Sequence, residues 1–183
     1  METIEEFKSF DSLLQADERW AIFALRDTVT NEIRRHSLLD RYSSIERVHL
    51  NPEAPAVIQS QFNIARMLGI YAWLYYPLHQ IAELKAFATM ERALRERLNS
   101  TKDGLNRLLK RAVEQRLIVD EGFRETFDHG EDPTGYTASL PDLLSDHRNE
   151  LAHGGSMLHP NSLTTLRVCA AVINQLFPSS PHV

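Results

Sequence analysis

Residues 146–155 read Asp-His-Arg-Asn-Glu-Leu-Ala-His-Gly-Gly, and this stretch near the C-terminal end decides how the chain is interpreted. Gly154 and Gly155 predict the end of a helix, because glycine readily takes the left-handed conformation that terminates helices. Arg148 and His153 are five residues apart, which places their side chains about 140° apart on a straight helix. The two can therefore face one ligand only if the helix ends near His153, as the glycine pair predicts.

Helical spacing continues on both sides of this stretch. Upstream, Ser139 is expected to cap the helix, with Pro141 in its first turn. Downstream, a last helix is expected over residues 161–177, and it ends before Pro178. Its apolar face is wide, and it comprises Leu163, Leu166, Cys169, Ala170, Ile173, Leu176 and Phe177. A face of that width indicates deep burial, or burial against a second subunit.

The middle of the chain also predicts helices. A long apolar stretch covers residues 59–98, and Pro77 should kink or divide it, because proline removes an amide hydrogen bond and clashes with the preceding turn. Residues 99–104 predict a turn. A further amphipathic helix follows, marked by Leu105, Leu108, Leu109, Ala112, Val113 and Leu117.

The N-terminal third predicts two helices, over residues 3–15 and 17–39, with Trp20, Ile22, Phe23, Leu25, Val29 and Ile33 on the buried face of the second. Residues 40–58 contain two prolines and predict a loop, and residues 119–138 predict a long acidic loop. We therefore expect an all-α bundle of about six to seven helices. Residues 1–58 would supply N-terminal helices and a loop that complete the fold, residues 59–178 the helical core, and residues 179–183 a disordered tail.

Length and composition restrict the possible classes. The chain has 183 residues, 43% of them hydrophobic, a net charge of −5 and one cysteine. These values indicate a globular domain and leave no intrachain disulfide framework or multi-thiolate zinc site. The acidic N-terminus does not resemble a signal peptide, and the longest apolar run, residues 68–78, is far short of the ~20 residues that span a bilayer. We expect a cytoplasmic protein with no membrane partner, no metal and no cofactor.

Charge is distributed unevenly along the sequence. Residues 92–116 contain eight arginines and lysines against three acidic residues, whereas residues 120–146 are mostly acidic. Two interpretations are open. The basic run could be a solvated helix face, which is the usual role of such runs, or it could form a local phosphate-binding surface on an otherwise acidic protein.

Arg148, Asn149 and His153 resemble the signature of the HEPN superfamily of small all-helical domains. That signature is an arginine, often followed by asparagine or aspartate, with a histidine four to six residues further on. The position of the motif is similar too, since it closes one helix and one last apolar helix follows. Residues 83–98 and 104–109 look like the middle helices of the family, and the resemblance covers roughly residues 60–177.

The resemblance implies a HEPN-like bundle that acts as a homodimer, in which two motifs meet in a cleft. It implies a metal-independent endoribonuclease, in a toxin–antitoxin or phage-defence setting, that cleaves RNA through attack by a ribose 2′-hydroxyl. Arg148 would then hold the scissile phosphate, His153 would transfer protons, and Asn149 would orient the backbone or the histidine. Other family members lack catalysis, so the alternative is a helical module that binds a partner protein, such as an antitoxin, or a nucleotide.

Glu91 is the fourth candidate site residue, because it shares a helix face with Leu84, Phe87, Ala88, Leu94 and Leu98. A buried carboxylate needs a partner. Arg148 is one possible partner, if the two helices pack together, and Arg95, one turn further along the same helix, is the other. A structural interpretation of the motif also stays open, with Arg148 bridging two helices and His153 capping the last carbonyls. His147 lies on an apolar stripe and is expected to be a satisfied core histidine.

Overall fold

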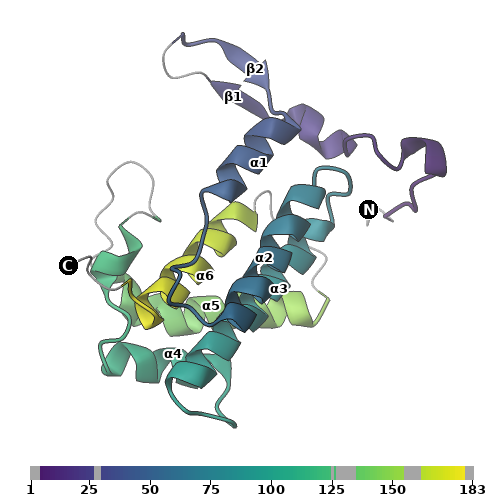
Figure 1. Cartoon of the computed structure of the whole chain (residues 1–183). Coiled ribbons are helices and arrows are strands. Elements are labelled where there is room, and N and C mark those ends of the chain that lie inside the picture. Colours follow the sequence, from purple (N-terminus) through teal and green to yellow (C-terminus); the bar gives the residue numbers. More distant parts are fainter. Residues whose placement is uncertain (1–4, 27–29, 125, 127–134, 155–161, 180–183) are drawn as a thin grey trace.

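The computed structural model describes residues 5–26, 30–124, 126, 135–154 and 162–179. These residues form a mainly helical fold with a small two-stranded sheet (Figure 1). The prediction of an all-helical class is therefore confirmed, with the sheet as an addition. The described α-helices are α1 (Leu38–Glu46), α2 (Ala56–Tyr71), α3 (Leu78–Arg97), α4 (Leu105–Glu114), α5 (Tyr136–Ala152) and α6 (Ser162–Leu176). Of the predicted tail, residues 180–183 lie outside the described residues.

The central helix of the bundle is α3, which contacts α2, α4, α5 and α6 (Figure 1). Small side chains permit the close approach of the neighbouring helices, since Ala82, Ala86 and Ala93 are completely buried. Phe87 and Leu94 are also completely buried, and each stabilises the fold by about 1.5–3 kcal/mol through removal of apolar surface from water. α3 therefore organises the core, and any charged side chain on its buried faces requires a partner.

The wide apolar face of α6 is buried within the chain. Leu166, Cys169, Val172 and Ile173 have no exposed surface, and α6 packs against α3. Of the two expectations for this face, deep burial is the one that the structure shows. The face of α6 thus gives no support to a dimer.

The predicted breaks in the middle of the chain are confirmed. Pro77 lies between the end of α2 and the start of α3. The turn between α3 and α4 contains Asn99 with a φ of 48°, a conformation that asparagine adopts more readily than most residues. These helices begin and end within a few residues of the predicted bounds, because proline and turn residues interrupt an otherwise continuous helical pattern.

The two helices predicted for the N-terminal region are wrong. The structure has two short 3₁₀ turns, η1 (Phe10–Ser12) and η2 (Glu18–Ile22), followed by a hairpin of β1 (Ala24–Arg26) and β2 (Ile33–Arg35). Ile22 and Ile33, expected on a buried face, are 80% and 75% exposed, and Val29 lies outside the described residues.

The loop predicted over residues 40–58 is also partly wrong, because α1 occupies its first third. Ser37 and Asp40 form a reciprocal capping box, in which each side chain bonds the backbone N–H of the other residue. This motif starts a helix at Leu38, where the prediction ended one.

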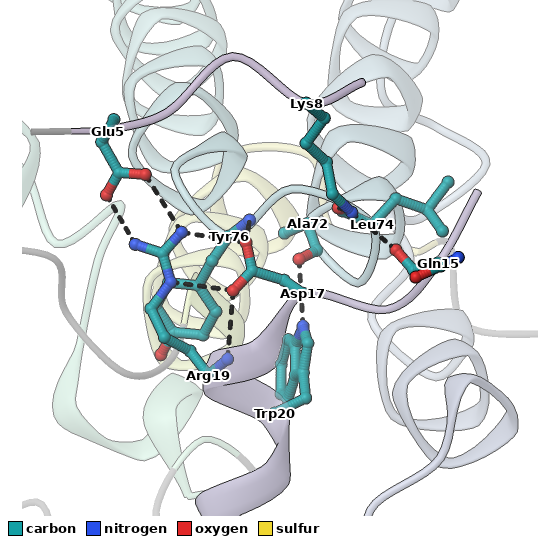
Figure 2. Close-up of polar contacts among 9 residues, drawn as sticks. All are labelled: Glu5, Lys8, Gln15, Asp17, Arg19, Trp20, Ala72, Leu74 and Tyr76. Atoms are coloured by element: carbon teal, nitrogen blue, oxygen red, sulfur yellow. Dashed lines mark hydrogen bonds and ion pairs between the residues drawn. The ribbon is translucent and has the colours of Figure 1, made fainter. Parts of the chain in front are cut away.

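Tertiary contacts explain the irregular N-terminal region, because residues 5–20 lie against the connection between α2 and α3 and form hydrogen bonds with it (Figure 2). Trp20 Nε1 donates to the carbonyl oxygen of Ala72 at 3.1 Å, and the Asp17 carboxylate accepts the backbone N–H of Tyr76 at 2.9 Å. Arg19 bonds Asp17 on one side and Glu5 on the other. Ala72 and Tyr76 lie more than fifty positions from Trp20 and Asp17 in sequence, and these contacts hold the segment in a shape that local helix propensity would not select.

Candidate functional site

The helix that carries the motif, α5, begins four residues before the predicted position. Gly135, with a φ of 78°, is its N-cap residue. The Asp120 carboxylate, from the turn η3 (Asp120–Phe123), accepts the N–H groups of Gly135 and Thr137 at 2.6 and 2.8 Å, and these bonds lower the pKa of Asp120. The prediction that Ser139 caps the helix is wrong, since its hydroxyl donates to the carbonyl oxygen of Tyr136. Pro141 accordingly lies inside the helix rather than in its first turn.

The C-terminal end of α5 is confirmed. Ala152 is the last helical residue, and His153 is the C-cap, its N–H donating to the carbonyl oxygen of Asn149 at 2.9 Å. Gly154 follows with a φ of 76°, the left-handed conformation that ends the helix. The His153 side chain is exposed. The histidine of the motif therefore lies at the helix end with its side chain open to solvent.

Glu91 and Arg148 meet between α3 and α5. One carboxylate oxygen of Glu91, Oε2, lies 3.3 Å from Nη2 of Arg148, and the other, Oε1, lies 2.6 Å from Nη2 of Arg95. Glu91 is 8% exposed, whereas the Arg148 and Arg95 side chains are 36% and 43% exposed. The sequence left two partners open for Glu91, and both are present. The carboxylate is buried beneath two arginines that still reach solvent.

A surface depression of about 500 Å³ surrounds this carboxylate and is lined by Ala88, Glu91, Arg92, Arg95 and Arg148. Three arginines and one carboxylate line the depression, so the lining has an excess of positive charge. Such an excess favours an anion, and guanidinium groups match the geometry of phosphate oxygens. The depression is therefore suited to a phosphate-bearing ligand.

Asn149 connects the two ends of the motif. Its side-chain oxygen accepts a hydrogen bond from Nη1 of Arg148 at 3.1 Å, and its carbonyl oxygen accepts the N–H of His153. The His153 side chain does not line the depression. The structure thus brings Glu91, Arg148 and Asn149 into contact, and it places His153 beyond them at the end of the same helix.

Three of the other six basic residues of the run form ion pairs. Asp103 accepts Arg107 at 3.3 Å and Arg111 at 2.5 Å, and Lys110 lies 3.4 Å from Asp142. These pairs agree with the interpretation of a solvated helix face for α4. Only the part of the run on α3, around Arg92 and Arg95, lies at the depression.

A second carboxylate of α3, Glu83, was missed by the sequence reasoning. It is 1% exposed, accepts the Thr165 hydroxyl at 2.8 Å, and lies 3.8 Å from Nε2 of His147. His147 packs edge-on against Phe87 and is half-buried, as expected for a core histidine, and Glu83 raises the pKa of His147. The sequence does indicate a buried position for Glu83. Glu83 lies one helical turn before Phe87 and Glu91 lies one turn after it, so all three share one helix face.

A third polar group, also missed, lies inside the bundle. Arg41 of α1 donates to the carbonyl oxygen of Gly69 at 3.0 Å and to the Ser162 hydroxyl at 2.7 Å, and its Nη2 lies 3.3 Å from Nδ1 of His79. Burial, and then the charge of Arg41, lower the pKa of His79 to about 3. Arg41, His79 and Ser162 are all buried, so this group has a structural role. It could not be predicted while residues 40–58 were interpreted as a loop.

Comparison of the chain with known protein families, with characterised proteins and with solved structures finds no match. No helix among the described residues is long and apolar enough to cross a membrane.

Proposed function

We propose that the chain is a metal-independent endoribonuclease of the HEPN type. The observation that carries this proposal is the position of Arg148, held at the surface between Glu91 and Asn149, on a helix that ends at the exposed His153. The sequence pattern Arg-Asn-x-x-x-His supports it further, because the family resemblance rests on that pattern.

Arg148 binds the scissile phosphate in this proposal. A guanidinium has five N–H donors. Arg148 uses one on Glu91 and one on Asn149, so donors remain for phosphate oxygens. Arg95 shares the charge of Glu91, which leaves the depression positive when Arg148 is paired. Glu91 and Asn149 therefore position the arginine without neutralising the site.

His153 transfers the protons. The ribose 2′-oxygen attacks phosphorus, the bond from phosphorus to the 5′-oxygen breaks, and the products carry a 2′,3′-cyclic phosphate and a 5′-hydroxyl. One histidine accepts the proton of the 2′-hydroxyl, and one donates a proton to the leaving oxygen. A homodimer with two adjacent motifs would supply both histidines. A toxin–antitoxin or phage-defence setting belongs to the same proposal and comes from the family resemblance.

The alternative function is a non-catalytic helical module that binds a partner protein or nucleotide. The Glu91–Arg148 ion pair favours it, because an arginine that only bridges α3 and α5 would make the same contact. In that case Arg148 stabilises the bundle and has no role toward RNA.

Cleavage of a structured RNA of mixed sequence in the presence of EDTA separates the two functions. The proposal expects cleavage by the wild type and loss of at least 100-fold in Arg148→Ala and in His153→Ala. Arg97→Ala is the matched control, since Arg97 is an exposed arginine of α3 outside the depression. Equal activity in all three variants would refute the assignment of the site.

A further inference from the structure

A second cleft, of about 610 Å³, lies near the C-terminal end of α6. It is bounded by the connection between α1 and α2, by η3, and by α6 from Arg167 onward with the residues that follow. It shares no lining residue with the depression around Glu91. Its volume lies within the range of about 300–1,000 Å³ that is common for small-molecule sites.

The wall of this cleft is fixed by hydrogen bonds. The Asn51 N–H donates to the side-chain oxygen of Asn174 at 2.7 Å, and the Asn51 amide nitrogen donates to the carbonyl oxygens of Asn174 and Phe177. The Asn174 amide nitrogen donates in return to the carbonyl oxygen of His49 at 3.1 Å. The cleft is therefore formed before any ligand arrives, which reduces the entropy lost on binding.

The lining of the cleft is rich in donors and positive charge. Arg47 and Arg167 both line it, and none of its described lining residues is a carboxylate. The Arg47 guanidinium makes no ion pair or hydrogen bond with a described residue. Arg167 has an interaction of its own, and the remaining donors of a guanidinium can still bind an ion.

Gln175 and His49 complete the lining of the cleft. The Oε1 atom of Gln175 accepts the Val119 N–H at 2.8 Å, which holds this side chain in place, and its Nε2 atom is buried out of reach of a ligand. The Nδ1 atom of His49 lies 2.9 Å from the carbonyl oxygen of Arg47, which can only accept, so the proton of that bond is on Nδ1. The Nε2 atom of His49 is left available to a ligand.

We infer that this cleft binds a phosphate monoester of a small molecule. The guanidinium of Arg47, the Nε2 atom of His49 and the donors of Arg167 that its own interaction leaves unused suit the terminal oxygens of a phosphate, and the negative charge of that group compensates Arg47. Val48, Ala170, Ala171 and Pro178 provide an apolar surface for the carbon skeleton of the ligand. The inference is independent of the proposed ribonuclease, because it depends on different residues.

Isothermal titration calorimetry of the full chain tests the inference, with ribose 5-phosphate, inorganic phosphate and ribose as probes at low salt. We expect saturable binding of ribose 5-phosphate and of phosphate, and affinity for ribose at least 10-fold weaker than for ribose 5-phosphate. Arg47→Ala should weaken ribose 5-phosphate binding by about 10- to 100-fold, as expected for the loss of a charged hydrogen bond. Arg97→Ala, which removes the same charge from an exposed position outside the cleft, should change it less than twofold.

Thermal unfolding of both variants shows whether they fold as the wild type does, and Arg47 is an exposed residue that should tolerate the change. The inference is wrong if the wild type binds neither phosphate-bearing probe. It is also wrong if ribose binds as well as ribose 5-phosphate, or if Arg47→Ala and Arg97→Ala bind equally well.

Discussion

Nη2 of Arg148 lies 3.3 Å from Oε2 of Glu91, and this contact joins the C-terminal half of α5 to the middle of α3. Glu91 is buried and has Arg95 as a second partner, whereas Arg148 keeps about a third of its side chain in solvent. The same contact could position a catalytic arginine or simply hold two helices together. The two roles differ in how strongly the stability of the protein depends on Arg148.

We predict that Arg148→Ala lowers the free energy of unfolding by about 1 kcal/mol or less. Arg95 still neutralises Glu91 in this variant, and solvent screens pairs made by partly exposed arginines. Urea unfolding measures the change, with Arg95→Ala as the matched variant because it removes the other partner of the same carboxylate. A loss of more than about 3 kcal/mol in Arg148→Ala alone, the size typical of breaking a buried pair, would support the structural role.

His79 should make the protein sensitive to acid. Burial lowers its native pKa to about 3, while the unfolded value is about 6.5. The unfolded chain therefore binds a proton at pH 5 that the native protein does not, and native stability falls as the pH drops below about 6.5. Between pH 7.5 and pH 5, protonation of His79 in the unfolded chain lowers the free energy of unfolding by about 2 kcal/mol. Urea unfolding at the two pH values should show a smaller difference for His79→Gln than for the wild type, and an unchanged difference would contradict the assignment.

His147 should show the opposite dependence on pH. Glu83 raises its native pKa above the unfolded value. The stabilisation is therefore fully present below about pH 6.5 and is lost as the pH rises through the native pKa. His147→Gln should accordingly cost more stability at pH 5.5 than at pH 8.5, measured by urea unfolding. A greater cost at pH 8.5 would show that the pair with Glu83 does not form.

Gly122 should be intolerant of a side chain. A Cβ atom there would meet the amide group of Gln175, which can turn away only by losing its hydrogen bond to the Val119 N–H. Gly122→Ala should therefore cost about 1 kcal/mol. The same Gly122→Ala change made in a Gln175→Ala background should leave the free energy of unfolding nearly unchanged. A loss of about 1 kcal/mol in that background as well would show that contact with Gln175 is not the cause.

The helices from α2 onward could be predicted because their signals are local. Pro77 and the turn before Leu105 divide the apolar pattern, and Gly154 ends α5 where a glycine is expected. The N-terminal region could not be predicted in the same way. Trp20 and Asp17 bind the α2–α3 connection, and nothing near them in sequence records those partners.

The candidate site divides along similar lines. Glu91 could be predicted because it lies on an apolar stripe that obliges a carboxylate to find a partner, and it has two. The contact between Arg41 and His79 could not be predicted, because it joins α1 to α3 across the bundle. It depends on α1, and the prolines in residues 40–58 led to the prediction of a loop there.

Metal-independent cleavage of RNA by the ribose 2′-oxygen, with Arg148 and His153 as the site, leaves characteristic ends on the RNA products. The measurement digests an end-labelled RNA in EDTA, identifies the new ends, and repeats the digestion with a 2′-deoxy nucleotide at the cleaved position. We expect 2′,3′-cyclic phosphate and 5′-hydroxyl ends, and no cleavage at the 2′-deoxy position. Products with 3′-hydroxyl and 5′-phosphate ends, or cleavage that persists without the 2′-hydroxyl, would contradict it.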